Sequence, residues 1–354
     1  MPSKRVSRSA TRCPRSDDGP EIDNERAAVV KETWDLTAPG LDLSLGQLTT
    51  LVQPALPGAT VVDSTPTQGG FANANYRLLL AGRKSPLLIR FFVRDPQAAA
   101  VEFAITSTLA GRAPIAPYLH AAADNPFTGH PYGIREWIEG ERLDLASQRL
   151  AGHAVMDIGR SVGATLARIH AVTFARTGFF DASLRVARPV SVGGDGLVQF
   201  LKLCLIEGRG AQRIEPDLVE SLIAFTERAG RTLDEWTGDP CLVHSDFGGA
   251  NILIRCTNGQ WQVAAVLDWE FAFSGTPFFD FGNLLRPPLG QWPGFEAAVV
   301  EGYLGGGGEL PDNWRRMSLL ADLYNWADFL NRPHATAALV ADAKAMIRRT
   351  MAMA

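Results

Sequence analysis

Residues 244–251 constrain this chain more than any other part of its sequence. They place Asp246 and Asn251 five residues apart in a glycine-rich loop, with His244 two residues before the Asp. An Asn-Gly pair at 258–259 predicts a tight turn between two strands, so a short β-hairpin should follow the loop. Asp268 ends the returning strand. Carboxylate and amide oxygens suit Mg²⁺, and the pattern therefore predicts a magnesium site beside the loop.

The spacing H-x-D-x-x-x-x-N is that of the catalytic loop of kinases, in which a later Asp binds metal. Phosphoryl transfer asks the protein mainly for positioning and for neutralisation of charge. We therefore expect Asp246 to accept the proton of a substrate hydroxyl, while Asn251 and Asp268 hold Mg²⁺ against phosphate oxygens. The alternative is an ordinary loop, in which Asp and Asn side chains bond to the backbone of a turn.

The string Asp-Phe-Gly, which marks the metal ligand of protein kinases, occurs at 246–248 and again at 280–282. Position favours Asp268 as the metal ligand, because it ends the strand that returns beside the loop. We expect Asp280 to be a helix N-cap that also braces the catalytic loop. His244 is expected to bond to the backbone rather than to act as a base, and Glu270 either reaches the metal or substrate or is simply exposed.

Arg90 is the one charged residue in the apolar run 87–93, which predicts a buried strand. A buried charge is costly unless it is paired, and Glu102, on the helix expected next, is the natural partner. Such a pair would position the cation on the α- and β-phosphates of a nucleotide, with Arg offering a planar, permanently charged fork. The alternative is an Arg that points to solvent from an edge strand.

Two further segments are candidates for nucleotide binding. Gly69 and Gly70 lie between two expected strands, where backbone N–H groups could close over phosphates, although a plain hairpin turn fits equally well. Asn73 or Asn75 would steady that loop. Residues 132–140 are expected to form a strand and hinge, with the carbonyl of Glu136 and the amide of Ile138 pairing with adenine.

The order of elements predicts the fold class. Strands with one helix precede a break near residue 139, and mainly helices with one inserted hairpin follow, so β-α alternation is absent and an α+β fold is favoured over a doubly wound sheet. We expect a tail (1–40), an N-lobe (41–138) with the ATP-binding sheet, and a helical C-lobe (139–354) with the catalytic loop and acceptor site. The expected strands are 60–64, 76–80, 87–93, 115–122, 132–138, 252–256 and 261–267; the expected helices are 21–31, 44–51, 95–110, 155–171, 197–207, 216–236, 280–285, 295–304, 314–330 and 335–351.

Composition excludes several classes of protein. A net charge of −4 over 354 residues argues against nucleic-acid binding by bulk charge, and no apolar run is long enough to predict a membrane span. The four cysteines are scattered without a C-x-x-C pair, which favours reduced thiols in the cytoplasm. The basic, serine-rich start, from Lys4 to Arg15, predicts a disordered tail, with an organelle transit signal as the alternative.

These features together resemble the aminoglycoside phosphotransferase (APH) family, within the choline kinase and protein-kinase-like superfamily. The matching pieces lie in the family's order at Gly69-Gly70 with Asn73, 88–90, Glu102, 135–141, 166–170, 244–251, 267–270 and 279–282. The resemblance covers roughly residues 60 to 330 and implies a bilobal kinase-like fold, ATP, Mg²⁺ and transfer of the γ-phosphate to a hydroxyl of a small molecule. It also implies that Asp246 is the base and that Asn251 and Asp268 bind metal.

The chain departs from the family's pattern at two positions, since Ser245 replaces the usual Gly and Arg90 stands where many members have Lys. The acceptor is not identified by sequence. Acids in the late helices could attract a polycationic aminoglycoside, and aromatic residues there could stack on a sugar or line an apolar pocket for a macrolide; solvated helix faces and core packing are the alternatives. The acids are Glu301, Glu309, Asp312, Asp322 and Asp328, and the aromatic residues are Trp269, Tyr324, Trp326 and Phe329.

Two other classes of function compete with a small-molecule kinase. A non-catalytic nucleotide-binding regulator could share the fold, but Asp246, Asn251 and Asp268 are all present. A protein kinase is disfavoured because the Asp-Phe-Gly strings are misplaced and no Ala-Pro-Glu string follows them.

Overall fold

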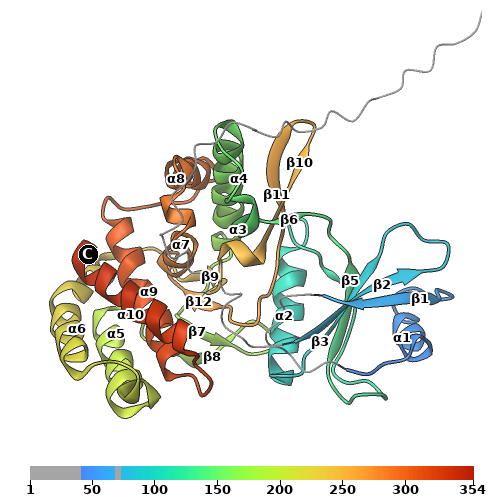
Figure 1. Ribbon diagram of the computed structural model, residues 1–354, viewed down its shortest axis with the longest axis horizontal. Helices are drawn as coiled ribbons and strands as arrows, with labels where there is room; N and C mark the ends of the chain where they lie inside the picture. Colours follow the sequence, from blue (N-terminus) through green and yellow to red (C-terminus); the bar gives the residue numbers. More distant parts are fainter. Residues whose placement is uncertain (1–40, 68–72) are drawn as a thin grey trace, which may run out of the picture.

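The computed structural model describes residues 41–67 and 73–354, and it joins a small sheet domain to a larger helical one (Figure 1). The expectations for the tail and for Gly69 and Gly70 lie outside the described residues. The small domain is a five-stranded antiparallel sheet in the order β1-β2-β3-β5-β4. Its strands are β1 (Val61–Pro66), β2 (Ala74–Leu80), β3 (Leu87–Phe91), β4 (Tyr118–Ala122) and β5 (Tyr132–Glu136).

Two helices accompany this sheet. Helix α1 (Leu45–Val52) begins at a capping box, in which Ser44 and Gln47 satisfy each other's backbone N–H groups. Its apolar side packs on the sheet in one cluster of buried residues. Helix α2 (Pro96–Leu109) begins after Asp95, its N-cap, and lies between the sheet and the helical domain (Figure 1). Ile105 and Leu109 of α2 belong to the core of the helical domain, so this helix ties the two domains together.

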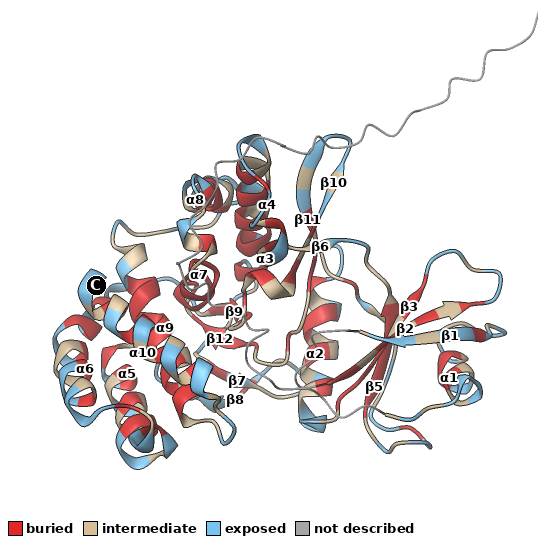
Figure 2. Cartoon of the chain, viewed as in Figure 1, coloured by how far each residue is buried: buried red, intermediate tan, exposed pale blue. Residues whose placement is uncertain are grey.

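The helical domain contains seven α-helices of more than one turn among the described residues, and they bury two large apolar clusters (Figure 2). The helices are α3 (Leu143–Ala146, a single turn), α4 (His153–His170), α5 (Gly194–Lys202), α6 (Pro216–Ala229), α7 (Phe278–Leu284), α8 (Phe295–Gly305), α9 (Trp314–Asn331) and α10 (Ala337–Met353). The predicted helix 197–207 is formed by α5 and by a π-helical segment, Leu203–Glu207, that follows it.

Several short strands of this domain were not predicted from sequence. The hairpin β10 (Ile252–Thr257) and β11 (Gln260–Val266) turns at Asn258 and Gly259, as expected, but β6 (Glu141–Arg142) joins it as a third strand. A four-stranded sheet, in the order β8-β7-β12-β9, carries the catalytic loop at the end of β9. Its strands are β7 (Gly178–Phe180), β8 (Val186–Pro189), β9 (Cys241–Val243) and β12 (Phe273–Gly275). Segments this short show no period-2 alternation that sequence could reveal.

Helices α4 and α8 pack at unusually short range. A Cβ at Gly163 would lie 2.0 Å from the carbonyl oxygen of Val299, and one at Gly302 would lie 2.1 Å from that of Arg160. Glycine is therefore required where the two backbones touch. This contact fixes the ends of both helices close to α7 and the catalytic loop.

The cysteines differ in state. Cys204 and Cys241 are buried free thiols, as expected of small core residues. Burial raises the pKa of the Cys204 thiol to about 12 and that of Cys241 well above its ordinary value. Cys256 is disulfide-bonded, so the expectation of reduced thiols is wrong for this residue.

No helix in the described part of the chain combines the length and the apolar character that a membrane crossing needs.

Candidate active site

The catalytic loop leaves β9 and returns into β10 through a single 3₁₀ turn. Asn251 uses its side-chain nitrogen twice, donating to the carbonyl oxygen and to Oδ2 of Asp246, both at 2.8 Å. Its amide oxygen is then the atom that could face a cation. The loop thus brings the predicted base and the predicted metal ligand into direct contact.

His244 is a structural residue, as predicted. The ring is fully buried, and its Nε2 lies 2.8 Å from the carbonyl oxygen of Leu267. Its Nδ1 accepts the backbone N–H of Asp246 at 3.2 Å, so the proton must be on Nε2. Both ring nitrogens are committed to the backbone. The ring therefore positions Asp246 and has no nitrogen left to act as a base.

Asp268 comes two residues after the end of β11 and lies beside the catalytic loop. The backbone N–H of Leu267 donates to the carbonyl oxygen of Asn251 at 2.8 Å, which fixes the two predicted metal ligands on neighbouring segments. Asp268 adopts a left-handed backbone conformation with φ of 67°, uncommon for any residue but glycine. Such strain is typical of functional sites, because the surrounding structure must hold it.

Arg90 lies on β3, a central strand between β2 and β5, so the alternative of a solvent-facing edge residue is wrong. Its guanidinium is 3% exposed and lies 3.3 Å from the carboxylate of Glu102, which confirms the expected pair. The same guanidinium nitrogen donates to Asp268 at 2.6 Å and lies 3.9 Å from Glu270. One buried cation therefore faces three carboxylates.

Glu270 is buried, so the alternative of an exposed carboxylate is wrong. Its side chain is 6% exposed, and it accepts a hydrogen bond from the amide of Asn73 at 2.9 Å. Burial, together with the nearby charge of Asp268, raises the pKa of Glu270 to about 7. The expected role of Asn73 or Asn75 in steadying the Gly69-Gly70 loop stays a prediction, because that loop lies outside the described residues.

Tyr118 is a site residue that sequence reasoning missed. Its hydroxyl donates to Glu102 at 2.5 Å, and burial raises its pKa above the ordinary range, so the hydroxyl stays protonated. Within residues 41–67 and 73–354, Arg90 Nε and Glu102 Oε2 are buried without a hydrogen-bond partner. An unsatisfied guanidinium nitrogen next to the predicted metal ligands fits the binding of phosphate oxygens, which accept hydrogen bonds from such donors.

No group of three His, Cys, Asp or Glu side chains in the described part of the chain forms a ready metal site. The donors that fit Mg²⁺ are instead one carboxylate and one amide oxygen, Asp268 and Asn251. This set suits a cation that keeps several water molecules and shares phosphate oxygens.

The predicted hinge residues lie at the end of β5. Glu136 pairs through its side chain with Arg83, and the next residue, Trp137, donates its backbone N–H to Pro86 at 3.1 Å. The adenine contacts of Glu136 and Ile138 stay predictions, because no contact in the structure tests them.

Asp280 braces the catalytic loop but is not an N-cap, which corrects one expectation. Pro277 occupies the N-cap position of α7, and Asp280 lies inside the first turn with no exposed surface. Its carboxylate turns away from the helix and accepts the backbone N–H groups of His244 and Ser245 at 2.9 and 2.8 Å. The carboxylate is drawn to the loop because two successive amides point at it.

The candidate acceptor residues are mostly structural. Trp269 and Trp326 are fully buried and Phe329 nearly so, which favours core packing over stacking on a substrate. Three of the five acids form ion pairs, as Asp322 pairs with Arg286, Glu301 with Arg160 and Asp328 with Arg332. Paired acids attract a polycation less than free ones do.

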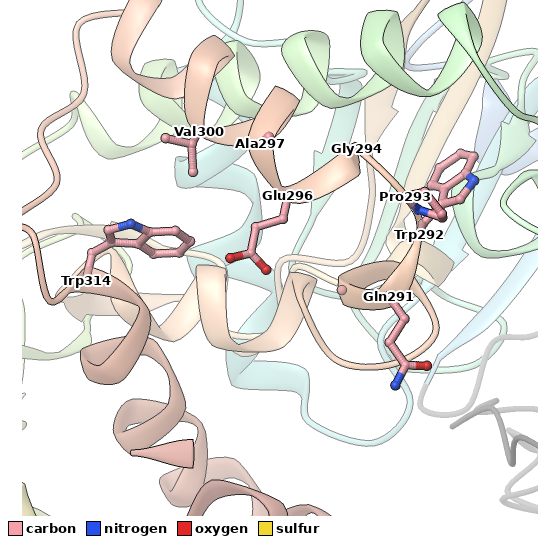
Figure 3. A pocket seen from close by; sticks show the side chains of 9 residues that line it. Gln291, Trp292, Pro293, Gly294, Glu296, Ala297, Val300 and Trp314 are labelled. Atoms are coloured by element: carbon pink, nitrogen blue, oxygen red, sulfur yellow. The ribbon is translucent and has the colours of Figure 1, made fainter.

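A hollow of about 610 Å³ lies between α8 and the start of α9 (Figure 3). Trp292 and Trp314 flank it, and Glu296 points into the space between them (Figure 3). None of the predicted site residues is in its lining, so this hollow is separate from the cluster around Asp246.

Comparison with known proteins assigns the family. A model of the phosphotransferase enzyme family (APH) matches residues 63–320. A search of the curated proteins found no match.

Solved structures of similar fold include phosphotransferases that act on antibiotics. The GDP complex of wild-type aminoglycoside 2'-phosphotransferase-IIIa is 16% identical, with 88% of this chain and 99% of that chain covered and a TM-score of 0.65. Macrolide 2'-phosphotransferase MphH from Brachybacterium faecium is 18% identical, covering 85% and 97%, with a TM-score of 0.61. The streptomycin-ATP-APH(2")-IIa ternary complex is 15% identical, covering 87% and 97%, with a TM-score of 0.59.

At these identities the structures show a shared kinase-like fold. The family match, which spans most of the chain, goes further. The chain belongs to the phosphotransferase enzyme family (APH) and is a small-molecule kinase.

Proposed function

We propose that the protein transfers the γ-phosphate of ATP, in the presence of Mg²⁺, to a hydroxyl of a small molecule, with Asp246 as the base. The observation that carries this proposal is the assembly of Asp246, Asn251 and Asp268 around one loop and hairpin, next to a buried arginine. The sheet domain (41–138) would bind ATP and the helical domain (139–354) the acceptor, in the cytoplasm.

Each residue has a distinct role in this proposal. Asp246 is half-buried and held by Asn251, so its carboxylate can accept the proton of a hydroxyl that is brought within hydrogen-bond reach. The amide oxygen of Asn251 and the carboxylate of Asp268 would hold Mg²⁺. When bound, the cation neutralises charge on the transferred phosphate. Arg90 would add a permanent positive charge with further donors for the phosphate chain.

The acceptor class follows the family only in outline. The structures of similar fold include a macrolide phosphotransferase and a phosphotransferase in complex with streptomycin, and both kinds of compound carry hydroxyl groups. We therefore propose an antibiotic, an amino alcohol or a sugar as the acceptor. The pairing of Asp322, Glu301 and Asp328 with arginines gives no support to a polycation in particular.

The test is a panel of aminoglycosides, macrolides, amino alcohols and sugars, assayed with Mg-ATP for ADP release and for a phosphorylated product. Asp246→Asn should abolish product formation on whichever acceptor the wild type accepts, because the base is lost. Asp63→Asn, an exposed change on β1, serves as the control and should behave as wild type.

Two outcomes would contradict the proposal. If Asp246→Asn phosphorylates the acceptor as fast as wild type, Asp246 is not the base. If Mg-ATP raises the melting temperature but no acceptor is phosphorylated and no ADP appears, the protein is a nucleotide-binding regulator with a kinase fold.

A further inference from the structure

Three buried polar side chains stand in line behind the catalytic loop. The hydroxyl of Tyr303, on α8, lies 3.0 Å from Nδ1 of His170, the last residue of α4. The other ring nitrogen, Nε2, lies 3.1 Å from Oδ2 of Asp280. Tyr303 and His170 are 3% and 6% exposed, and Asp280 is fully buried. The line ends on the two backbone amides that Asp280 accepts, those of His244 and Ser245.

The direction of the hydrogen bonds follows from the chemistry of the end groups. Burial raises the pKa of Tyr303 above its ordinary value, so its hydroxyl keeps its proton and can donate to Nδ1 of His170. A carboxylate that already accepts two backbone N–H groups must meet a donor, so Nε2 carries the ring proton and donates to Asp280. The opposite tautomer would set the lone pair of Nε2 against the carboxylate.

The same line explains how a strained backbone is kept in place. Ser245 has a φ of 66°, a left-handed conformation that ordinary residues adopt at a cost of about 1–2 kcal/mol. Its N–H is one of the two amides bound by Asp280. Ser245 immediately precedes Asp246, and any relaxation of its backbone would therefore swing the carboxylate of Asp246 away from its position beside Asn251.

We propose that His170 and Tyr303 are positioning residues for phosphoryl transfer, which orient the carboxylate of Asp280 so that it holds Ser245 left-handed and Asp246 in place. This inference rests on the proposed function, because it takes Asp246 as the base. Neither side chain touches the reacting groups, and both act through Asp280. The close contact of α4 and α8 at Gly163 and Gly302 gives the pair a rigid support.

The test separates positioning from folding by means of graded variants. His170→Ala should lower kcat about 10- to 100-fold with an unchanged KM for ATP, because misplacing a catalytic group acts on the chemical step. His170→Gln keeps a nitrogen donor near the place of Nε2 and should stay within about threefold of wild type. Tyr303→Phe removes one neutral hydrogen bond and should lower kcat about fivefold. Thr226→Val, which removes a buried hydroxyl bonded to the carbonyl oxygen of Leu222 within α6, is the control and should keep the wild-type kcat.

Relief of strain gives a second, independent measurement. Added to His170→Ala, the change Ser245→Gly should recover at least about threefold in kcat, because glycine adopts the left-handed conformation without strain. Amide hydrogen exchange at residues 244 and 245, measured without substrates, should be faster in His170→Ala than in wild type and near wild type in His170→Gln.

The outcomes decide the inference in every case. Unchanged kcat in folded His170→Ala, a His170→Gln enzyme no better than His170→Ala, or unchanged exchange at 244–245 would each overturn it. If His170→Ala does not fold, the Gln and Phe variants carry the same comparison. If wild type phosphorylates no acceptor, the proposed function fails, while the exchange measurement still shows whether the brace exists.

Discussion

Two buried arginines of this protein lie in opposite kinds of environment. Arg286, after α7, makes three hydrogen bonds to both carboxylate oxygens of Asp322, at 2.6–3.2 Å, and its guanidinium lies 4.2 Å from the ring of Trp326. The same carboxylate also accepts the indole N–H of Trp326 at 2.7 Å. Arg90 is as deeply buried but, among the described residues, has one hydrogen bond, to Asp268, and faces two further carboxylates.

The difference separates a structural ion pair from the candidate phosphate-binding site. In the Arg286 pair, planar donors and carboxylate acceptors match one another, and the pair has little capacity for a further ligand. Around Arg90, in the described part of the chain, Arg90 Nε, Glu102 Oε2 and Asn73 Oδ1 lack hydrogen-bond partners. Buried polar groups without partners are destabilising, and they are typical of sites that a ligand completes. Whether the N–H donors of a buried arginine have hydrogen-bond partners therefore indicates its role better than its burial does.

Removal of the structural pair should have the largest effect. Arg286→Ala leaves the carboxylate of Asp322 buried without its cation, and we expect the free energy of unfolding to fall by about 3–5 kcal/mol. Urea denaturation at neutral pH measures this loss. Arg160→Ala, which breaks the exposed pair with Glu301, is the control and should leave the midpoint unchanged. A stable Arg286→Ala protein with impaired ATP turnover would reverse the assignment.

Removal of the cation at the site should act mainly on turnover. Arg90→Ala is expected to lower kcat/KM for ATP about 100-fold, or about 2.7 kcal/mol, because the positive charge beside the phosphates is lost. Arg90→Lys keeps the charge and should recover part of this loss. Steady-state kinetics with varied ATP measure both variants. Unchanged kinetics in Arg90→Ala, with stability lost instead, would show that the two arginines have the same role.

The excess of carboxylates around Arg90 should appear in the dependence of stability on pH. The folded protein raises the pKa of Glu270 to about 7, so between pH 4.5 and 7 the folded state binds more protons than the unfolded chain does. The free energy of unfolding should therefore fall as pH rises through this window, by on the order of 2 kcal/mol without Mg²⁺.

Urea denaturation in EDTA across this pH range gives the measurement. Glu270→Gln should flatten the curve, because the titrating group is removed. The exposed Glu220, on α6, provides the control, and Glu220→Gln should keep the wild-type slope. The expectation would be contradicted if the free energy of unfolding of wild type rose from pH 4.5 to 7 in the same way as that of Glu270→Gln.

The smallest effect concerns the backbone of the catalytic loop. Ser245→Gly should raise the free energy of unfolding by about 0.5 kcal/mol, because the gain from relieving a left-handed residue is partly offset by the greater freedom of glycine when unfolded. Thermal denaturation is sensitive enough to detect it. Asn258→Gly is matched, since Asn258 is also left-handed with φ of 54° but tolerates that conformation, and it should gain less. A loss of stability in Ser245→Gly would show that the serine side chain matters more than the backbone.

Features with a local cause could be predicted from sequence. The capping box of Ser44 and Gln47, the N-cap at Asp95 and the turn at Asn258 each depend on neighbours a few residues away, and each is present in the structure. The pairing of Arg90 with Glu102 could also be predicted, because a charge in a buried strand needs a partner on the next element.

Features that depend on contacts between residues far apart in the chain could not be predicted from sequence. The line from Tyr303 to Asp280 joins His170 to residues 133 and 110 positions away, and nothing in the local sequence of His170 indicates either partner. The local sequence of Glu270 does not reveal its environment, because its hydrogen-bond partner Asn73 lies 197 residues earlier. The predicted N-cap role of Asp280 is wrong for a related reason. Its carboxylate accepts two backbone N–H groups of the catalytic loop, which is far away in the sequence.

The buried thiol of Cys241 has a practical consequence. It lies on β9, three residues before His244, with a pKa held well above the ordinary value by burial. Thiol reagents attack the thiolate, so the folded strand should resist alkylation until β9 leaves its sheet. The rate of alkylation of the Cys241 sulfur, measured by mass spectrometry, would then report how often the strand that carries the catalytic loop opens.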